Sequence, residues 1–470
     1  MCPEESTPEQ NTPGEREDRL EKLKKLRDLD IDPYPSRSSR THHISSILSD
    51  FQQYKDGQQV IIVAGRLMTK RSHGNLIFAS LRDDSGEIQI AVSKKDIGED
   101  LFKTFSKLID RGDFVEITGY CFITQKGEES IMAQNWQLLS KSVRPLPEKW
   151  HGIKSEEERL RKRYLDMLMN PEVKDMIVKK ERFWNSVRNF LKTRGFLEVE
   201  TPVLETTPGG GDAEPFATHH NALDIDVYLR ISMGELWQKR LMVGGLEKTF
   251  EIGRQFRNEG MDAEHLQDYT QMEFYWAYAD YEDGMELVQE LFKYVAWETF
   301  GTLQFEINGF SVDLDQEWAH YDYQETVKEY TGVDVLNTTE EEVRQKLDEL
   351  GVKYDEVGFN LNRGIDNLWK YCRKQLGGPG FLVNVPKLIS PLAKQDRERP
   401  GLTQRFQPII AGTELGNGYS ELNDPIDQAE RFAQQQQMRE EGDAEAQMHD
   451  HDFVEALEYG MPPTCGFGLR

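Results

Sequence analysis

The sequence has 470 residues, of which 37% are hydrophobic and 8 are tryptophan, so it is long enough for two or three folded domains and too apolar for a disordered chain. No run of about eighteen apolar residues is present and the N-terminus is acidic and polar, which argues against a membrane-spanning helix or a signal peptide. The net charge of −26 argues only weakly against nucleic acid as a partner, because a local basic face can bind phosphate on an acidic protein. The four cysteines form no CxxC pair, which favours a reduced, cytoplasmic location.

The N-terminal part of the chain begins with a polar segment and continues with a helical pattern. Residues 1–20 are rich in Glu, Pro and Thr and are expected to form a flexible tail. Residues 21–59 are expected to form a helical segment, because leucines recur at helical spacing as far as Leu29. Residues 32–35 contain two prolines and interrupt this pattern.

Residues 60–142 carry a strand pattern with short alternating segments and turn residues between them. The expected order is three strands, a helix and two more strands: 60–66, 76–81, 87–92, then the helix near 101–108, then 113–120 and 129–133. This is the order of a five-stranded OB-fold barrel, a fold that often binds single-stranded nucleic acid. The pattern alone fits a generic small β-barrel equally well.

A proline-bearing linker over residues 143–158 precedes a long segment, 159–470, in which helices and strands are mixed. One predicted helix ends at Gly195, and its apolar face is formed by Met176, Phe183, Val187, Phe190 and Leu191. Residues 250–257 and 271–278 alternate in polarity and flank a polar loop, which predicts an antiparallel hairpin.

Several common chemical motifs are absent from the sequence. It has no GxxxxGK[ST] loop, no GxGxxG after a strand, no GxSxG elbow and no HExxH. A P-loop ATPase, a Rossmann oxidoreductase and a zinc protease are therefore poor interpretations. The acidic stretch at residues 449–452, His-Asp-His-Asp, is interpreted as solvated surface rather than a metal site.

The predicted hairpin gathers charged residues of both signs. The residues on or beside it are Arg254, Arg257, Glu259, His265, Glu273 and Tyr275. Glu273 and Tyr275 are two residues apart on one strand, so they face the same side of the sheet. Cations beside carboxylates suit a site that binds a phosphate and an amine together, although a surface ladder of salt bridges has the same composition.

Four segments together resemble class II aminoacyl-tRNA synthetases. Residues 250–260, FEIGRQFRNEG, resemble motif 2 of that class, and residues 195–202, GFLEVETP, resemble motif 1, which in the family builds the dimer interface. Residues 209–221, with PFATHHN, and residues 414–424, ELGNGYSELND, resemble the lysyl-tRNA synthetases in particular.

The resemblance implies a fold and a reaction. The fold is α+β, with an N-terminal five-stranded OB-fold barrel that binds the anticodon (60–142) followed by a class II catalytic domain (159–470) whose mostly antiparallel sheet is flanked by helices. The implied reaction is lysine–tRNA ligation, in which ATP converts lysine to lysyl-adenylate and the lysyl group passes to the 3′ end of tRNA(Lys). The implied partners are L-lysine, ATP, Mg²⁺ as cofactor and a second copy of the chain in a homodimer.

The same resemblance implies roles for individual residues. Arg257 and Glu259 would carry the catalysis. ATP would be bound by Arg257, Glu259, His265 and Tyr269. Lysine would be bound by Gly210, Glu235, Arg257, Glu273, Tyr275, Asn417 and Glu421. Glu414 would be a magnesium ligand, with Gln407 as a weaker second one. In the barrel, the anticodon would be read by Arg71, Phe78 and Gln89, within a basic patch formed by Arg66, Lys70, Arg71 and His73.

The sequence departs from the family pattern at three places. Gln407 stands where a second acidic metal ligand is usual, and Asn135 stands where an acidic anticodon contact is usual. At residues 466–470, GFGLR, the match to motif 3 ends with Arg470 at the position of a glycine, before the arginine that grips ATP in the family. The sequence is therefore expected to be a fragment that ends within motif 3.

Two alternative functions stay open from the sequence alone. One is a related ligase that lysylates an elongation factor, although that family lacks a barrel such as residues 60–139. The other is a non-catalytic tRNA-binding protein, which the incomplete motif 3 would explain.

Overall fold

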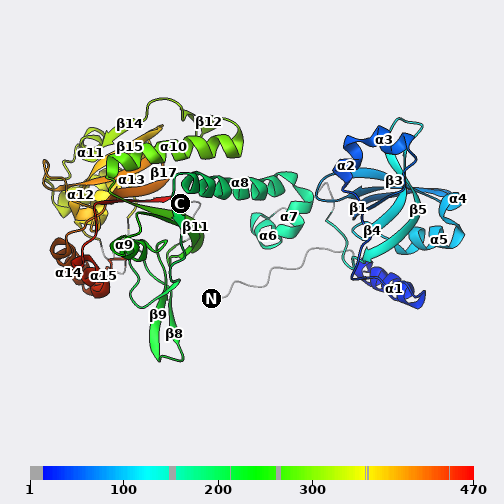
Figure 1. Cartoon of the computed structure of the whole chain (residues 1–470), viewed down its shortest axis with the longest axis horizontal. Coiled ribbons are helices and arrows are strands. Elements are labelled where there is room, and N and C mark those ends of the chain that lie inside the picture. The colour runs from blue at the N-terminus through cyan, green and yellow to red at the C-terminus, as the bar shows by residue number, and fades with distance from the viewer. Residues whose placement is uncertain are drawn as a thin grey trace. The chain divides into compact units, whose positions relative to one another are not determined.

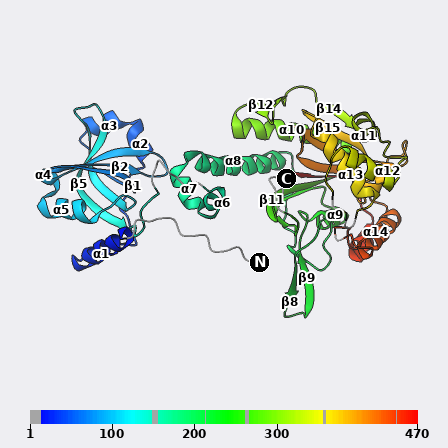
Figure 2. The same cartoon turned by 180° about the vertical axis from the view of Figure 1, so that it is seen from behind.

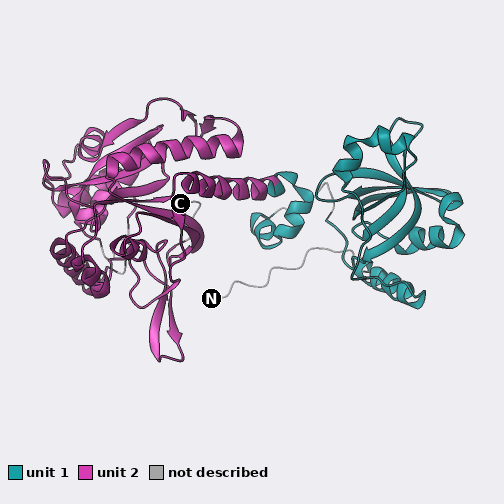
Figure 3. Cartoon of the chain, viewed as in Figure 1, with its two compact units in different colours: residues 1–174 teal, residues 175–470 magenta. Residues whose placement is uncertain are grey.

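The computed structural model describes residues 14–147, 155–211, 213–260, 266–354, 356, 359–443 and 445–469. The chain divides into two compact units, residues 1–174 and residues 175–470 (Figure 3). Figures 1 and 2 show a small barrel in the first unit and a large sheet with helices in the second. Part of the expected linker, residues 148–154, lies outside the described residues.

The first unit contains a closed five-stranded barrel with the strand order β1-β2-β3-β5-β4. Its strands are β1 (Ile61–His73), β2 (Leu76–Arg82), β3 (Glu87–Ser93), β4 (Phe114–Ile123) and β5 (Glu129–Ser140). Helices α4 (Lys94–Ile97) and α5 (Glu99–Leu108) lie between β3 and β4. The predicted OB-fold is therefore confirmed.

Alternation along the strands explains the barrel core. In β2 every second residue is buried, so Ile77, Ala79 and Leu81 point inward while the residues between them remain partly accessible. Phe105 of α5 and Trp136 of β5 pack edge to face at 5.4 Å within the same core.

The remaining helices of this unit are α1 (Glu15–Asp28), α2 (Ile44–Ser49), α3 (Phe51–Asp56), α6 (Glu156–Arg161) and α7 (Arg163–Met169). Helix α1 begins at Glu15, within the segment that was predicted to be a flexible tail. The helix is fixed by the buried Arg19, whose guanidinium donates to the carbonyl oxygens of Arg111 and Ser142. Leu26 is buried, whereas Leu29 is 56% exposed just beyond the helix end.

The second unit is built on one large sheet with the order β14-β15-β16-β18-β19-β11-β10-β6 and with β17 paired to β16. Its strands are β6 (Leu197–Glu198), β10 (Lys248–Phe256), β11 (Asp268–Ala277), β14 (Ala319–Asp322), β15 (Gly380–Pro386), β16 (Leu402–Ile410), β17 (Thr413–Glu414), β18 (Gly416–Ser420) and β19 (Thr464–Leu469). Among the described strands of this sheet, only the pairs β6–β10 and β14–β15 are parallel, which confirms the expected mostly antiparallel sheet.

Smaller strands and helices surround this sheet. The strands are β7 (Leu204–Glu205), β8 (Ala217–His220), β9 (Ile225–Leu229), β12 (Gln304–Ile307) and β13 (Phe310–Asp313). The helices are α8 (Pro171–Thr193), which begins four residues before the second unit, α9 (Glu235–Val243), α10 (Tyr281–Phe300), α11 (Tyr323–Thr331), α12 (Glu340–Glu349), α13 (Leu361–Arg373), α14 (Pro425–Glu440) and α15 (His451–Glu458), with a 3-10 turn at Lys387–Ile389.

One face of the sheet is covered by α10 and carries the aromatic core (Figure 1). Phe274 of β11, Phe406 of β16 and Phe467 of β19 pack on that face, and the rings of Phe406 and Phe467 stack at 5.7 Å. Because side chains alternate along a strand, the residues beside these phenylalanines point to the opposite face. That opposite face holds the candidate site.

The long helix α8 is buried over only part of the apolar face that the sequence predicts. Val187, Phe190 and Leu191 are buried in the sheet core, and Phe183 packs against it. Met176 is 54% exposed, so the prediction that it shares the buried face is wrong. No helix among the described residues is long and apolar enough to cross a membrane.

Candidate functional site

The side chains of Glu273 and Tyr275 lie in the candidate site, on the face of the sheet away from α10. The Tyr275 hydroxyl donates to Glu273 Oε2 at 2.9 Å, which confirms that the two residues share a face. Glu273 Oε1 accepts from the backbone N–H of Met233 and from Gln271 Nε2, both at 2.8 Å. These three bonds fix the carboxylate in a single orientation.

Two glycines of β19 form the floor beside these side chains. Gly468 lies opposite Glu273 and Gly466 lies opposite Tyr275. A Cβ at Gly466 would overlap Glu421 Oε1 and stand 2.7 Å from the Tyr275 ring, and a Cβ at Gly468 would stand 2.9 Å from Gln271 Nε2. A side chain at either position would occupy the space that the side chains of Gln271, Tyr275 and Glu421 now fill.

Three buried carboxylates and one buried ammonium meet above this floor. Glu235, at the start of α9, is 6% exposed, and Glu421, just after β18, is 1% exposed. Lys239 Nζ lies 2.7 Å from Glu235 Oε1 and 2.6 Å from Glu421 Oε2. The Tyr419 hydroxyl also hydrogen-bonds Glu235 Oε1. No described residue hydrogen-bonds Glu421 Oε1.

The protonation of these groups follows from burial and mutual repulsion. Burial raises the pKa of Glu273 to about 7, and the nearby Glu235 carboxylate adds to the shift. Burial also raises the pKa of Glu421 well above its usual value, although Lys239 opposes this. Burial lowers the pKa of Lys239, but the carboxylates of Glu235 and Glu421 outweigh it and raise that pKa above its usual range. The cluster is thus prepared to receive a further cation.

Gly210 lies against the first turn of α9. Its φ of +85° lies in the left-handed region, which a glycine adopts without strain. A Cβ there would stand 2.5 Å from Ser232 Oγ and 2.6 Å from Glu235 Cβ. The backbone at Gly210 is therefore brought next to the Glu235 side chain.

Asn417 of β18 lies opposite Gly468 and continues the site along the sheet. Its Oδ1 accepts from Arg405 Nε at 2.7 Å and from Gln407 Nε2 at 3.5 Å. These contacts orient the side-chain amide of Asn417. Arg405 was not predicted as a site residue, because nothing in its local sequence distinguishes it from a surface arginine.

The residues expected to bind ATP lie around the β10–β11 hairpin: Arg257 and Glu259 come just after β10, and Tyr269 is the second residue of β11. Arg257 is half-buried, and its Nε donates to the carbonyl of Ile231 at 3.3 Å. Glu259 is half-buried in the loop that follows, and Tyr269 lies on the same sheet face as Glu273. His265 lies outside the described residues. Arg254, another charged residue of this hairpin, points to the face of the sheet opposite Glu273 and forms an ion pair with Asp268.

Two oxygen-bearing side chains lie at the β16–β17 hairpin. Glu414 pairs with Ile409 across the hairpin, and Gln407 precedes Ile409 by two residues, so both point to the same side of the ribbon. A carboxylate and an amide oxygen are hard donors, and Mg²⁺ commonly binds through one or two protein oxygens plus phosphates and water. These two residues fit a magnesium ion held jointly with a nucleotide.

The acidic stretch at residues 449–452 is not wholly solvated. Asp450 is buried, caps α15 through the backbone N–H of Phe453, and forms an ion pair with Arg240 at 3.0 Å. The interpretation of this stretch as solvated surface is therefore wrong for Asp450, which joins α15 to α9. His451 and Asp452 are exposed, as expected.

In the barrel, the three predicted anticodon residues share one outer face. Arg71 lies opposite Phe78 across β1 and β2, and Gln89 lies opposite Ser80, two residues after Phe78. Arg71 is exposed, Phe78 is half-buried, and Gln89 Nε2 donates to Ser130 Oγ at 2.9 Å. An exposed cation beside a partly exposed aromatic ring is the combination that holds an unstacked base.

The predicted basic patch on the barrel is only partly present. Lys70 Nζ donates to the carbonyl oxygens of Phe105, Ser106 and Ile109 at 2.5–2.8 Å, so it caps the C-terminus of α5. Arg66 stacks its guanidinium over the Phe114 ring at 4.2 Å. The prediction is therefore wrong for these two residues, whereas Arg71 and His73 are exposed.

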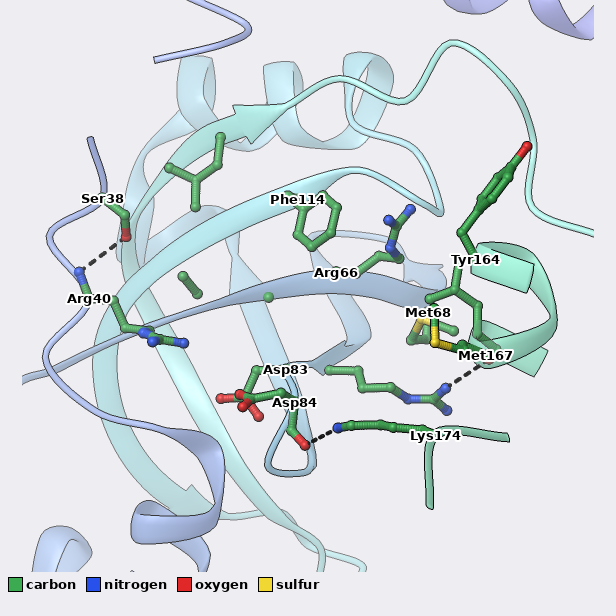
Figure 4. A pocket seen from close by; sticks show the side chains of 15 residues that line it. Ser38, Arg40, Arg66, Met68, Asp83, Asp84, Phe114, Tyr164, Met167 and Lys174 are labelled. Atoms are coloured by element: carbon green, nitrogen blue, oxygen red, sulfur yellow. Dashed lines mark hydrogen bonds between the residues drawn. The ribbon is translucent and has the colours of Figure 1, made fainter. Parts of the chain in front are cut away.

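A cavity of about 820 Å³ in the first unit lies beside Arg66 and Phe114 (Figure 4). Two of its basic residues already have backbone partners, since Arg82 donates to the carbonyl of Leu168 and Lys174 donates to the carbonyl of Asp84. Of the residues predicted to form the tRNA site on the barrel, Arg66 lines this cavity, whereas Arg71, Phe78 and Gln89 do not.

Comparison with known proteins agrees with both parts of the fold. The profile described as tRNA synthetases class II (D, K and N) matches residues 155–469, and that described as an OB-fold nucleic acid binding domain matches residues 61–139. The lysine–tRNA ligase of Carboxydothermus hydrogenoformans is 45% identical over 453 residues, which cover 96% of this chain and 92% of that protein. The enzymes of the same name from Thermoanaerobacter pseudethanolicus and Thermotoga maritima are 46% and 43% identical, covering 96% and 97% of this chain and 90% and 91% of those proteins.

The chain belongs to the class II lysine–tRNA ligases. Within this family member, the part of motif 3 at Gly466 and Gly468 forms β19 at the centre of the sheet, and Arg470 lies outside the described residues. Lys239, which lies between Glu235 and Glu421 in the carboxylate cluster, was not among the predicted site residues. The only signal for it was its spacing, four residues after Glu235 on one helix.

Proposed function

We propose that this protein activates lysine with ATP to lysyl-adenylate and transfers the lysyl group to the 3′ end of tRNA(Lys) in the cytoplasm. The observation that carries the proposal is the buried cluster of Glu235, Glu273 and Glu421 on the open face of the sheet. Three carboxylates in an apolar setting are costly unless cations replace their hydration. A substrate with two ammonium groups supplies those cations.

Each end of lysine has suitable partners in the cluster. Glu273, Tyr275 and Glu421 would receive the ε-ammonium, while Glu235 and the Gly210 backbone would receive the α-amino group. Arg257 and Asn417 would bind the carboxylate. Leucine or glutamine would leave the buried carboxylates without a cation, so binding alone would reject them strongly.

Adenylate formation requires positioning and charge stabilisation. Arg257 would hold both the lysine carboxylate and the α-phosphate of ATP, so that the carboxylate oxygen attacks phosphorus in line with the departing pyrophosphate. Glu259, His265 and Tyr269 would bind the nucleotide. Glu414, and more weakly Gln407, would hold Mg²⁺, which would neutralise phosphate charge when bound.

The barrel would bind the anticodon of the tRNA. Phe78 would stack on a base, and Arg71 and Gln89 would contact base edges. Asn135 is exposed on β5 and would read its base with an amide instead of a carboxylate. The presence of the barrel also weighs against a ligase that lysylates an elongation factor.

We also propose that two copies of the chain associate through the motif 1 region. Exposed apolar side chains are present there on α8 and on the strands that follow it, with Ile177 47%, Leu197 53% and Leu204 50% exposed. A group of exposed apolar residues of this kind is typical of a protein–protein interface.

ATP–pyrophosphate exchange tests the proposed chemistry. Labelled pyrophosphate should enter ATP in the presence of L-lysine, and aspartate or asparagine should support no exchange above background. Exchange with aspartate instead would refute the lysine assignment. Absence of exchange together with retained tRNA binding would favour the non-catalytic alternative.

A further inference from the structure

Lys239 is a buried cation inside the pocket that the proposed function assigns to a cationic substrate. It is 1% exposed, and its ammonium lies between Glu235 of the same helix and Glu421 from beyond β18. The Tyr419 and Phe453 rings lie 5.4 and 5.9 Å from its Nζ. The cation is therefore held on several sides.

The charges of the pocket can be counted from these residues. Glu235, Glu273 and Glu421 contribute three carboxylates, and Lys239 contributes one ammonium that is a permanent part of the protein. Tyr275 and Tyr419 also face the cluster, and burial raises the pKa of both hydroxyls well above their usual value, so they remain neutral. The fully ionised pocket thus lacks two positive charges, which equals the number of ammonium groups on lysine.

Lys239 also fixes the distance between two carboxylates on different elements. Glu235 belongs to α9 and Glu421 to the segment after β18, and the two are joined through one ammonium with contacts of 2.7 and 2.6 Å. Without that bridge, like charges would repel and Glu421 would lose its only ion pair among the described residues.

We propose that Lys239 is a positioning residue that sets both the charge and the length selectivity of the amino-acid pocket. Its ammonium neutralises one of the three carboxylates and holds Glu235 and Glu421 at a fixed separation, so that the pocket accepts a diamine of one length. This inference rests on the proposed function, since it assumes that the pocket binds lysine.

The test compares Lys239→Met and Lys239→Arg with the unmodified protein. The first readout is the preference for L-lysine over L-ornithine in kcat/KM for pyrophosphate exchange, because ornithine is shorter by one methylene. A well-fitted pocket discriminates one methylene by roughly 10–200-fold. We expect this preference to fall to within about threefold of unity in Lys239→Met, because the two carboxylates are no longer held apart at a fixed spacing.

The second readout is the number of protons released when L-lysine binds, measured by calorimetry at pH 7 in two buffers of different ionisation enthalpy. Without Lys239, one more carboxylate is protonated in the empty pocket, so lysine binding should release about one additional proton. Lys239→Arg keeps the charge and should leave the proton count unchanged, while its bulkier guanidinium should still lower the preference for lysine over ornithine. This variant keeps the test decisive if Lys239→Met does not fold.

Lys248→Met serves as the matched control. Lys248 lies on the other face of the same sheet, over the Trp276 ring at 4.6 Å. Its replacement should change neither readout. An unchanged preference and proton count in both Lys239 variants, with lysine binding to the unmodified protein intact, would overturn the inference. Failure of the unmodified protein to bind lysine would instead refute the proposed function.

Discussion

Gly466 of β19 lies directly opposite Tyr275 of β11, and a Cβ atom at Gly466 would stand 2.7 Å from the Tyr275 ring. The same atom would overlap Glu421 Oε1. The absence of a side chain at Gly466 therefore leaves room for both groups that the proposal assigns to the ε-ammonium of lysine.

Gly466→Ala should consequently impair lysine use. The added methyl group must displace either the Tyr275 ring or the Glu421 carboxylate, and small displacements at a reacting site cost on the order of 100-fold. We expect kcat/KM for lysine in pyrophosphate exchange to fall by that factor. Gly244→Ala, at the end of α9 where φ is −71°, is the control and should stay within about twofold of the unmodified protein. Equal activity of the two variants would contradict the packing described for the site.

The raised pKa of Glu273 predicts a pH dependence of lysine binding. With this pKa at about 7, the Glu273 carboxyl of the empty pocket is increasingly protonated at lower pH, and the proton must leave before the carboxylate can pair with an ammonium. The Kd for lysine should rise about tenfold from pH 8 to pH 6. Titration calorimetry across this range measures it, and a Kd that is flat with pH would show that Glu273 is ionised throughout.

The Glu273 carboxyl should also make the free protein less stable as the pH rises, whereas it makes lysine bind more tightly. Its pKa in the folded protein lies above the usual 4.5, so between pH 4.5 and about 7 the folded state without lysine binds more protons than the unfolded state. The contribution to stability is therefore complete below pH 4.5 and is lost as the pH rises through about 7. Added lysine should raise the melting temperature more at pH 8 than at pH 6, where protonation competes with it. A lysine-induced shift of the same size at both pH values would contradict this coupling.

Phe78→Ala should weaken tRNA recognition without affecting adenylate formation. Stacking of a base on an aromatic ring contributes about 1–3 kcal/mol, so KM for tRNA should rise roughly 5- to 150-fold. Lysine-dependent pyrophosphate exchange should be unchanged. Leu101→Ala, at an exposed apolar residue of α5, is the control and should alter neither activity. A tRNA KM that is unaffected by Phe78→Ala would remove Phe78 from the anticodon site.

Neighbouring cations of β1 should respond differently to substitution. Lys70→Met leaves three carbonyl oxygens at the end of α5 without their donor and should lower the free energy of unfolding of the barrel by about 2 kcal/mol. Arg71→Ala should leave stability unchanged but weaken tRNA binding and reduce its salt dependence. Urea denaturation and tRNA titration at several salt concentrations separate the two effects. Stable protein with impaired tRNA binding in Lys70→Met would restore Lys70 to the basic patch.

The sequence predicted those features that depend on local periodicity. Alternation located the barrel strands and placed Glu273 and Tyr275 on one face, because a strand repeats every two residues wherever it lies. The roles predicted for Arg257, Glu259 and Tyr269 came from the resemblance to the synthetase family and not from periodicity. Lys239 was missed and Lys70 was misassigned because Glu421 and the carbonyl oxygens at the end of α5 come from distant segments of the chain. A buried lysine also has the same sequence signature as a solvated one. Met176 was misassigned because a helical apolar face does not show where the core ends.

Aminoacylation of tRNA is the measurement that tests the central claim most directly. The protein, incubated with ATP, Mg²⁺, labelled L-lysine and tRNA(Lys), should place lysine on the tRNA in an acid-precipitable, alkali-labile ester. The same reaction with labelled aspartate, or with a tRNA whose anticodon is altered, should give no more than background. Formation of lysyl-adenylate without any transfer to tRNA(Lys), or charging with aspartate, would contradict the assignment of lysine–tRNA ligation to this chain.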